Sequence, residues 1–418
     1  MNILIVCNKF PYPLKDGGAI ATFAMIKGFA QTGHSVTVAA INTKKHYCNV
    51  ETLPDDVRKL ADFHAVNVDT TITISGTLKN LLFSKQPYTA TRFFVPQFAD
   101  LLKDLTAKTQ FDVIQLEGVY MCEYIDVLRK NQSSQATILN SKLYTLIPTL
   151  SYRAHNVEYE IWERLYKECG NPLKRWYLKN LAQRVENYEK SQLNCYDFIV
   201  PITERDAQKY NEIGNVKPVC VTPTGFDEEK IKALPSHEQA ISLFHIGSLE
   251  WLPNQQGLLW FLQHCWDDLY QEFPHITLRI AGRNAPQHFI DAVQNQSGVE
   301  FCGEVPDAQQ FMAENTIMIV PLLSGGGMRI KIVEGLAYSK AIVSTSIGAE
   351  GIDAEKYNAI CIANSAEEFT AALRNLLQND NKRKELEANA IYFVRNHFEN
   401  TVLIQKLLQF YSDNVACV

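Results

Sequence analysis

Short apolar runs alternate with longer helical segments along most of the chain. Several of the runs are apolar throughout instead of alternating with polar residues, which is typical of parallel strands covered on both faces. Strands that alternate with helices predict βαβ units in open, doubly wound sheets. The predicted strands are Asn2–Cys7, Ser35–Ala40, Phe63–Val68, Phe111–Leu116, Ile147–Arg153, Asp197–Val200, Lys217–Thr222, Ser242–Ile246, Thr277–Ala281, Val299–Cys302, Ile317–Val320 and Ala341–Ser344.

The same pattern predicts two domains of comparable size. A turn at Pro223–Asp227, followed by a polar stretch, marks a boundary before a fresh strand. We therefore expect an N-terminal Rossmann-like domain over residues 1–226 and a second one over residues 227–391, facing each other across a cleft. A last helical segment, roughly Tyr392–Ser412, opens the remaining residues 392–418, which we expect to return to the first domain.

Composition and charge exclude several classes of protein. Hydrophobic residues make up 46% of the 418 residues and charged residues 21%, as in ordinary globular domains. A net charge of -6 argues against a general nucleic-acid binder. Residues 1–10 are predicted to form a strand and not a secretory signal, and no apolar run is long enough to cross a membrane. Ten cysteines without a CxxC pair favour a reducing compartment, so we expect a cytoplasmic protein whose membrane contact, if any, is peripheral.

Two stretches, Gly76–Leu105 and Trp162–Lys179, combine aromatic or aliphatic residues with lysine and arginine. This mixture suits the inner surface of a membrane or a lipid-linked acceptor. It equally suits an amphipathic helix packed on its own domain with a solvated basic face. Both interpretations stay open at this point.

The segment Ser324–Glu334 is the strongest candidate site, because it follows a predicted strand and opens a predicted helix. Its glycines, Gly325, Gly326 and Gly327, let the backbone approach a diphosphate closely, and the start of the helix offers N–H donors. Arg329 and Lys331 bring positive charge. Glu334, about one helical turn in, is placed to accept hydrogen bonds from the hydroxyls of a ribose.

Other candidates also lie at the carboxyl ends of predicted strands, where doubly wound sheets bind ligands. Gly17 and Gly18 open the first helix, which Asp16 is expected to cap, and form a weaker anion site. Gly247 gives close access to a phosphate or sugar. His155 follows the fifth strand and is a candidate for contact with a substrate hydroxyl, and Glu117, after the fourth, is a weaker candidate.

Six segments together resemble the family 4 retaining glycosyltransferases of GT-B fold, and the similarity extends over nearly the whole chain. The glycine-rich segment resembles most the bacterial subgroup that serves exopolysaccharide or glycan assembly. The segments are the loop at Gly17, RAHNVE at residues 153–158, PTGFD at 223–227, GSLEWLPN at 247–254, GEVPD at 303–307 and GGGMRIKIVEGLAYSKAIVST at 325–345.

The resemblance implies a role for individual residues. Glu334 would hold the donor ribose, and Arg329 with the amides of Gly325–Met328 would hold the diphosphate. Val305 would lie near the nucleobase, and His155 near O6 of the donor sugar or the reacting centre. No metal or other cofactor is implied, since positive groups and a helix N-terminus stabilise the leaving diphosphate.

The sequence departs from the family pattern in two places. Gly326 stands where the family commonly has a glutamate that touches the donor sugar. The usual arginine and lysine of the Gly247 loop are replaced, with Glu250 and Asn254 nearby. These departures leave the identity of the sugar open.

The sequence therefore predicts a metal-independent retaining hexosyltransferase that uses a UDP-sugar or GDP-sugar donor and a glycan or lipid-linked acceptor. One alternative is a GT-B enzyme of the nucleotide-sugar 2-epimerase type, which needs acid and base carboxylates such as Glu117 and Glu158. A second is a catalytically degenerate GT-B protein that binds glycan.

Overall fold

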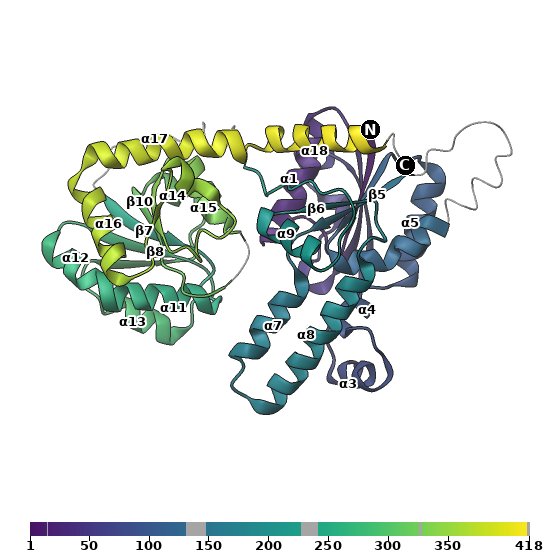
Figure 1. Cartoon of the computed structure of the whole chain (residues 1–418), viewed down its shortest axis with the longest axis horizontal. Coiled ribbons are helices and arrows are strands. Elements are labelled where there is room, and N and C mark those ends of the chain that lie inside the picture. The colour runs from purple at the N-terminus through teal and green to yellow at the C-terminus, as the bar shows by residue number, and fades with distance from the viewer. Residues whose placement is uncertain (15, 131–147, 227–240, 326–327, 416–418) are drawn as a thin grey trace. The chain divides into compact units, whose positions relative to one another are not determined.

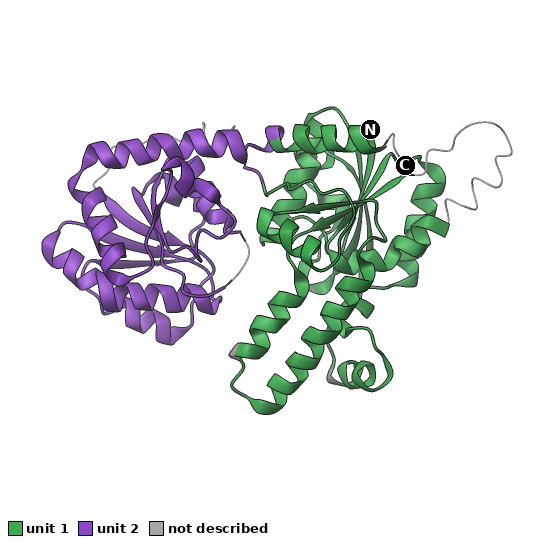
Figure 2. Cartoon of the chain, in the orientation of Figure 1, with its two compact units in different colours: residues 1–224, 403–418 green, residues 225–402 purple. Residues whose placement is uncertain are grey.

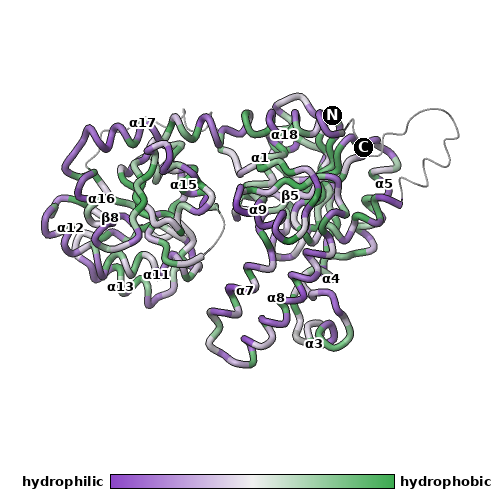
Figure 3. The backbone as a smooth tube through the Cα atoms, in the orientation of Figure 1, coloured by the Kyte–Doolittle hydropathy of each residue, from purple (hydrophilic) through white to green (hydrophobic). Residues whose placement is uncertain are grey.

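The computed structural model describes residues 1–14, 16–130, 148–226, 241–325 and 328–415 (Figure 1). The chain divides into two compact units (Figure 2). Unit 1 holds Met1–Thr224 together with Leu403–Val418, and unit 2 holds Gly225–Val402. Each unit is built around one parallel six-stranded sheet whose strands are largely hydrophobic (Figure 3).

The sheet of unit 1 has the strand order β3-β2-β1-β4-β5-β6, and all neighbouring strands are parallel. This is the order of a doubly wound Rossmann sheet, so the predicted fold class is confirmed. The order reverses between β1 and β4, and the loops that follow these strands meet there. The strands are β1 (Asn2–Cys7), β2 (Ser35–Thr43), β3 (Asp62–Val68), β4 (Val113–Glu117), β5 (Thr149–Ala154) and β6 (Phe198–Pro201).

Helices cover both faces of this sheet, which explains why its central strands are apolar throughout. On β1, Ile3 and Ile5 face a layer that includes α1 and α18, while Leu4 and Val6 face a layer that includes α5 and α8. Asp16 caps α1 as predicted, because its side chain accepts a hydrogen bond from Ala19 N. The helices are α1 (Gly17–Gln31), α2 (Asp55–Arg58), α3 (Ile74–Phe83), α4 (Tyr88–Thr91), α5 (Pro96–Lys108), α7 (Glu158–Glu168), α8 (Pro172–Gln192), α9 (Glu204–Glu212) and most of α18 (Asn400–Val415).

Unit 2 repeats the arrangement with the order β12-β11-β10-β7-β8-β9, which reverses between β7 and β10. Its strands are β7 (Ser242–Ile246), β8 (Thr277–Ala281), β9 (Val299–Gly303), β10 (Ile317–Val320), β11 (Ala341–Ser344) and β12 (Cys361–Ile362). Its helices are α11 (Leu252–Phe261), α12 (Asp267–Glu272), α13 (Gln287–Gln294), α14 (Ala308–Ala313), α15 (Ile330–Ala337), α16 (Ala366–Gln378) and α17 (Asp380–His397). A single π-turn, Leu262–Trp266, joins α11 to α12.

The PTGFD segment meets the junction between α17 and α18. Phe226 N donates to Phe398 O at 2.9 Å, and Asn400 N donates to Phe226 O at 3.1 Å. A Cβ at Gly225 would lie 2.9 Å from Asn400 Cα, so the two backbones can approach only because this residue is glycine. The predicted continuous helix Tyr392–Ser412 is therefore wrong: these backbone bonds interrupt it after α17.

The strands differ from the prediction in two places. Lys217–Thr222 runs along β6 and bonds to it, but only Val219 forms a bridge, with Ile199. Prolines within and just after the segment, Pro218 and Pro223, have no N–H to extend the ladder. The two-residue strand β12 was not predicted, because so short a pairing leaves no apolar run. The start of the predicted strand Ile147–Arg153 lies outside the described residues.

Candidate functional site

A first candidate site lies in unit 1, where β4 and β5 end beside α1. Glu117, the last residue of β4, is only 3% exposed. Its Oε2 accepts hydrogen bonds from Thr22 Oγ1 at 2.9 Å and from His155 Nε2 at 2.6 Å, and its Oε1 accepts one from Gln115 Nε2 at 2.5 Å. The structure thus brings together Glu117 and His155, which the sequence had placed at two separate strand ends.

The charge on Glu117 fixes how His155 is held. Burial alone would raise the pKa of Glu117, but the hydrogen bond and charge of His155 and the charge of Arg153 bring that pKa below its ordinary value. An ionised carboxylate can only accept, so Nε2 of His155 carries the proton in this contact. The other ring nitrogen, Nδ1, is the one through which the imidazole can contact a substrate.

A buried hydrogen-bond chain connects this pair to α18, and no sequence pattern indicates it. Tyr411 OH donates to Gln115 Oε1 at 3.0 Å, and Ser151 Oγ lies 2.8 Å from the same hydroxyl. Because Gln115 Nε2 bonds Glu117, the chain runs from α18 through the sheet to His155. Arg153, fully buried, lies against it, with Nε 3.8 Å from Glu117 Oε2.

A second carboxylate holds the backbone that follows His155. Glu189, on α8, accepts from Glu158 N and Tyr159 N at 3.1 Å each, which satisfies the first N–H groups of α7. Tyr210 OH donates to Glu189 Oε1 at 2.6 Å and also reaches Asn156 O at 3.0 Å. Burial raises the pKa of Glu189 to about 7 in spite of these donors. The loop carrying His155 is therefore fixed on both sides.

The start of α1 differs from what Gly17 and Gly18 suggested. The carboxylate of Asp16 already caps the helix, and it pairs with Lys9 Nζ at 2.5 Å, with His46 Nδ1 at 3.6 Å from its other oxygen. A Cβ at Gly18 would lie 2.9 Å from Lys9 Nζ, so this glycine makes room for the lysine. Lys9 was missed, although its position just after the first strand is a signal that could have found it.

A second candidate site lies in unit 2, on the loop between β10 and α15. Gly325 has a φ of +111°, and a Cβ there would lie 2.8 Å from both Arg329 Nη2 and the Trp251 ring. The Arg329 guanidinium lies 4.8 Å from the centroid of that ring, a cation–π contact. Only glycine fits this position, in conformation and in space. Gly326 and Gly327 lie outside the described residues.

Glu334 stands in the second turn of α15 as the spacing predicted, and Lys331 is its ion-pair partner. Lys331 Nζ lies 2.6 Å from Glu334 Oε2, with the Glu334 side chain 19% exposed. Burial and the charge of Glu334 raise the pKa of Tyr338 to about 12, so that phenol stays neutral. Within this unit Lys331 therefore orients the carboxylate, while Arg329 is the cation next to the glycine loop.

The Gly247 loop adjoins the end of β7 and is fixed by polar side chains. A Cβ at Gly247 would lie 2.8 Å from Asn254 Nδ2 and 3.2 Å from His245 Nε2. Asn254 Nδ2 donates to Ser248 O at 2.9 Å. His245 Nδ1 bonds Ile319 O at 3.0 Å, and burial lowers the pKa of His245 to about 4, so this imidazole is neutral. His245 was missed because a histidine inside an apolar strand looks like core.

The two other predicted contacts in unit 2, Val305 and Met328, are apolar residues. Val305 and Met328 are partly buried, and both pack against the same apolar cluster of unit 2. That cluster also includes Ile332 and Val333 of α15. Val305 and Met328 therefore support the loop, and an apolar face of this kind suits the flat side of a nucleobase.

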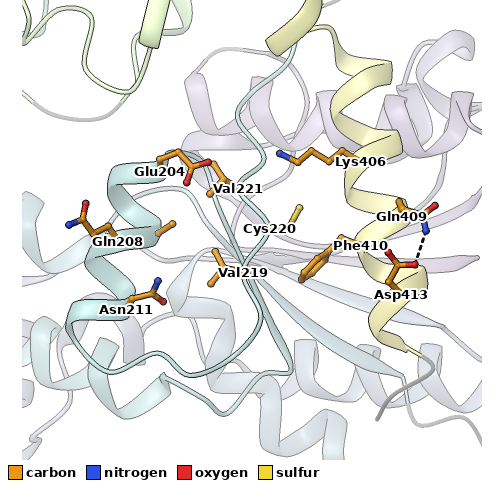
Figure 4. A pocket seen from close by; sticks show the side chains of 11 residues that line it. Glu204, Gln208, Asn211, Val219, Cys220, Val221, Lys406, Gln409, Phe410 and Asp413 are labelled. Atoms are coloured by element: carbon orange, nitrogen blue, oxygen red, sulfur yellow. Dashed lines mark hydrogen bonds between the residues drawn. The ribbon is translucent and has the colours of Figure 1, made fainter.

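A separate pocket of about 780 Å³ opens in unit 1 between α9 and α18 (Figure 4). Its floor is Val219–Val221, and Glu204, Gln208, Lys406 and Phe410 stand around it. None of the predicted site residues lines this pocket. It is a different feature from the site at the strand ends.

The residues that the structure describes lack two features, a membrane-spanning helix and a metal-binding cluster. Within them, no helix is long and apolar enough to cross a bilayer. Over the same part of the chain, no group of three or more His, Cys, Asp or Glu side chains is arranged to hold a metal ion.

Comparison with known proteins relates this geometry to a family. Residues 240–379 match the family described as glycosyl transferases group 1. The chain is 21% identical over 424 residues to an uncharacterised 44.6 kDa protein in the cps region of Klebsiella pneumoniae, covering 97% of this chain and 99% of that protein.

Two solved structures share the whole fold. Sucrose-phosphate synthase from Thermosynechococcus elongatus has a TM-score of 0.68 at 13% identity, with 100% of each chain covered. HepE from Anabaena, in complex with UDP-glucose, has a TM-score of 0.65 at 13% identity, covering 99% of this chain and 100% of that one. These similarities confirm the two-domain Rossmann-like GT-B fold. The family match over residues 240–379 confirms the prediction of a glycosyltransferase, and that part of the chain is similar to the group 1 family.

Proposed function

We propose that this glycosyltransferase moves a hexose-type sugar from a UDP-sugar or GDP-sugar to a glycan or lipid-linked acceptor, with retention of anomeric configuration and without a metal. One observation carries the proposal: in the loop between β10 and α15 the guanidinium of Arg329 packs closely on Gly325 and on the Trp251 ring, and Glu334 follows on the helix. Bare backbone, a cation and a carboxylate are what a ribosyl diphosphate needs.

The proposed reaction uses these groups for binding and charge stabilisation. Arg329 and the N-terminus of α15 stabilise the diphosphate as the bond from its oxygen to the anomeric carbon breaks. The acceptor hydroxyl attacks the face that the diphosphate leaves, and the departing oxygen takes the hydroxyl proton. His155, held by Glu117, contacts the donor sugar. HepE from Anabaena, which shares the fold, was solved with UDP and with UDP-glucose, which favours a nucleotide-sugar donor.

The geometry argues against the epimerase alternative. A base in an epimerase needs a carboxylate oxygen that can reach the sugar. Both oxygens of Glu117 already accept hydrogen bonds from side chains of unit 1. Glu158 Oε1 is also occupied, because it accepts a hydrogen bond from Tyr120 OH at 2.8 Å.

The proposal is tested with a panel of UDP-sugars and GDP-sugars. We expect one of them to raise the melting temperature of the full chain, because a ligand that binds only the folded state stabilises it. That sugar is then incubated with a membrane glycolipid extract and followed by NMR. Transfer of the sugar to an acceptor with the anomeric configuration of the donor retained supports the proposal. An inverted product, an epimer formed without acceptor, or no stabilisation by any nucleotide sugar contradicts it.

A further inference from the structure

The structure brings the two aromatic–basic stretches of unit 1 together. One contains α3, and the other contains α7 and the first half of α8; these helices extend away from the sheet (Figure 1). Arg184 of α8 donates to Leu81 O and Ser84 O, both at 2.9 Å, which fixes the end of α3 against α8. Residues about 100 positions apart in the chain therefore belong to one surface.

Large apolar side chains on this surface point to solvent. On α3, Leu82 is 70% and Phe83 is 82% exposed. On the first turns of α8, Leu173 is 81% and Trp176 is 61% exposed. The rest of α8 buries a normal apolar face that includes Val185, whereas α3 also exposes Leu78, to 52%. A soluble protein rarely leaves several such residues together without a partner.

Along α3 and the first half of α8 the charged side chains are all basic, while the neighbouring α7 carries Glu163, which pairs with Lys167. Residues 70–98 and 169–185 contain no aspartate or glutamate, although the chain as a whole has 46 acidic and 40 basic residues. The exposed cations of these stretches are Lys79, Lys85, Lys174, Arg175 and Lys179. The surface is therefore positive on a protein whose net charge is -6.

We propose that α3 and the first turns of α8 dock on the headgroups of an anionic lipid bilayer. Their exposed side chains Leu82, Phe83, Leu173 and Trp176, with the surrounding lysines and arginine, are named here the α3–α8 surface. Exposed Trp, Phe and Leu side chains insert at the boundary between headgroups and acyl chains, and surrounding lysines and arginines pair with anionic headgroups. An acidic protein surface would pair with the basic side chains. It would bury the four exposed apolar side chains only if it also had pockets that fit them, whereas a bilayer accepts apolar side chains of any shape. The inference goes beyond the transfer reaction, because it depends on this surface and not on the donor site.

Vesicle co-sedimentation of the full chain, without nucleotide, tests it. We expect binding to phosphatidylcholine vesicles containing one quarter phosphatidylglycerol and little binding to phosphatidylcholine alone. Salt screens the attraction between the basic side chains and the anionic headgroups. We therefore expect vesicle binding to decrease as the sodium chloride concentration is raised. The double variant Phe83→Ser/Trp176→Ser is expected to lower the partition coefficient about tenfold or more. Lys174→Gln/Arg175→Gln lowers it about fivefold for each charge removed.

Matched controls keep the outcome interpretable. Tyr392→Ser and Val216→Ser remove apolar side chains that are 66% and 81% exposed elsewhere, and these are expected to leave binding unchanged. The substituted side chains are exposed, so every variant is expected to melt like the parent. The proposal is overturned if the parent ignores anionic vesicles, if the controls lose as much binding as the α3–α8 variants, or if the surface captures an acidic protein instead. None of these outcomes depends on whether the chain transfers sugar.

Discussion

The two candidate sites, one in each unit, are built by different means. In unit 1 the proposed sugar contact is a side chain, His155: Glu117 on β4 bonds its ring, Glu189 on α8 holds the backbone that follows it, and Tyr411 on α18 bonds Gln115 beside Glu117. In unit 2 the proposed diphosphate contact is the backbone of the loop before α15, where Arg329 packs closely on Gly325 and Glu334 pairs with Lys331. Positioned side chains suit contact with a reacting sugar, and backbone amides suit a diphosphate. We therefore propose that the first region recognises the sugar and the second recognises the nucleotide.

The largest effect is expected from Gly325→Ala, which attacks the backbone region. Alanine is strained at a φ of +111°, and its Cβ would collide with Arg329 and the Trp251 ring. We expect nucleotide affinity to fall by about a hundredfold or more. Gly33→Ala is the matched control, because it has a φ of +83° but nothing within 4 Å of the added Cβ. If both variants bind nucleotide equally well by calorimetry, the backbone of this loop is not the binding surface.

The next effect comes from the side-chain region. His155→Ala is expected to lower kcat about a hundredfold while nucleotide affinity stays within about twofold. The reason is that the imidazole contacts the sugar in the proposed reaction, and the nucleotide is held by unit 2. His64→Ala, in β3, serves as control because that imidazole pairs with Asp62 at the surface. A loss of nucleotide affinity in His155→Ala, with kcat retained, would reverse the assignment of the two regions.

Tyr411→Phe tests whether α18 contributes to the position of His155. The ring packing stays, but Gln115 Oε1 and Ser151 Oγ lose their partner. We expect kcat to fall about tenfold with an unchanged donor KM, and the activity to become more dependent on pH as Glu117 loses a fixed neighbour. Phe410→Leu, next to it on the same helix, changes packing without touching the hydrogen-bond chain. Equal effects of the two substitutions on kcat would mean that the hydroxyl acts only through stability.

The smallest effect is a pH dependence of stability from Glu189. Its pKa rises from 4.5 to about 7 on folding, so the folded state binds this proton more tightly than the unfolded chain. The favourable contribution is complete below pH 4.5 and is lost as the pH rises through 7. Glu189→Gln removes this dependence. Relative to the parent, the variant is expected to gain about 2 kcal/mol in unfolding free energy between pH 5.5 and 7.5. Parallel pH profiles for parent and variant in urea unfolding contradict the assigned pKa.

The sequence predicted what depends on neighbouring residues. Apolar runs identified both sheets, because strands buried on two faces carry few polar positions, and the order of strand, glycine loop and acid predicted the position of α15 and of Glu334 on it. Contacts between residues far apart in the chain could not be predicted from the sequence. Tyr411 lies 296 positions from Gln115, and no local pattern links them. Lys331 was expected to neutralise phosphate, but its spacing of three from Glu334 lets it pair with that carboxylate instead. The prediction of a full strand over Lys217–Thr222 did not weigh Pro218 within it and Pro223 just after it against its apolar residues.

The central claim is that the loop before α15 and Glu334 bind a nucleoside diphosphate. Calorimetric titration of the full chain with UDP and with GDP tests it directly, beside Glu334→Ala and the control Glu385→Ala, a carboxylate on α17 that pairs at the surface with Lys382. The account predicts that one nucleotide binds to the parent and to Glu385→Ala alike, and about 10–100-fold more weakly to Glu334→Ala, as expected when a carboxylate loses its hydrogen bonds to a ribose. Equal affinity in all three proteins, or no binding of either nucleotide, would contradict it.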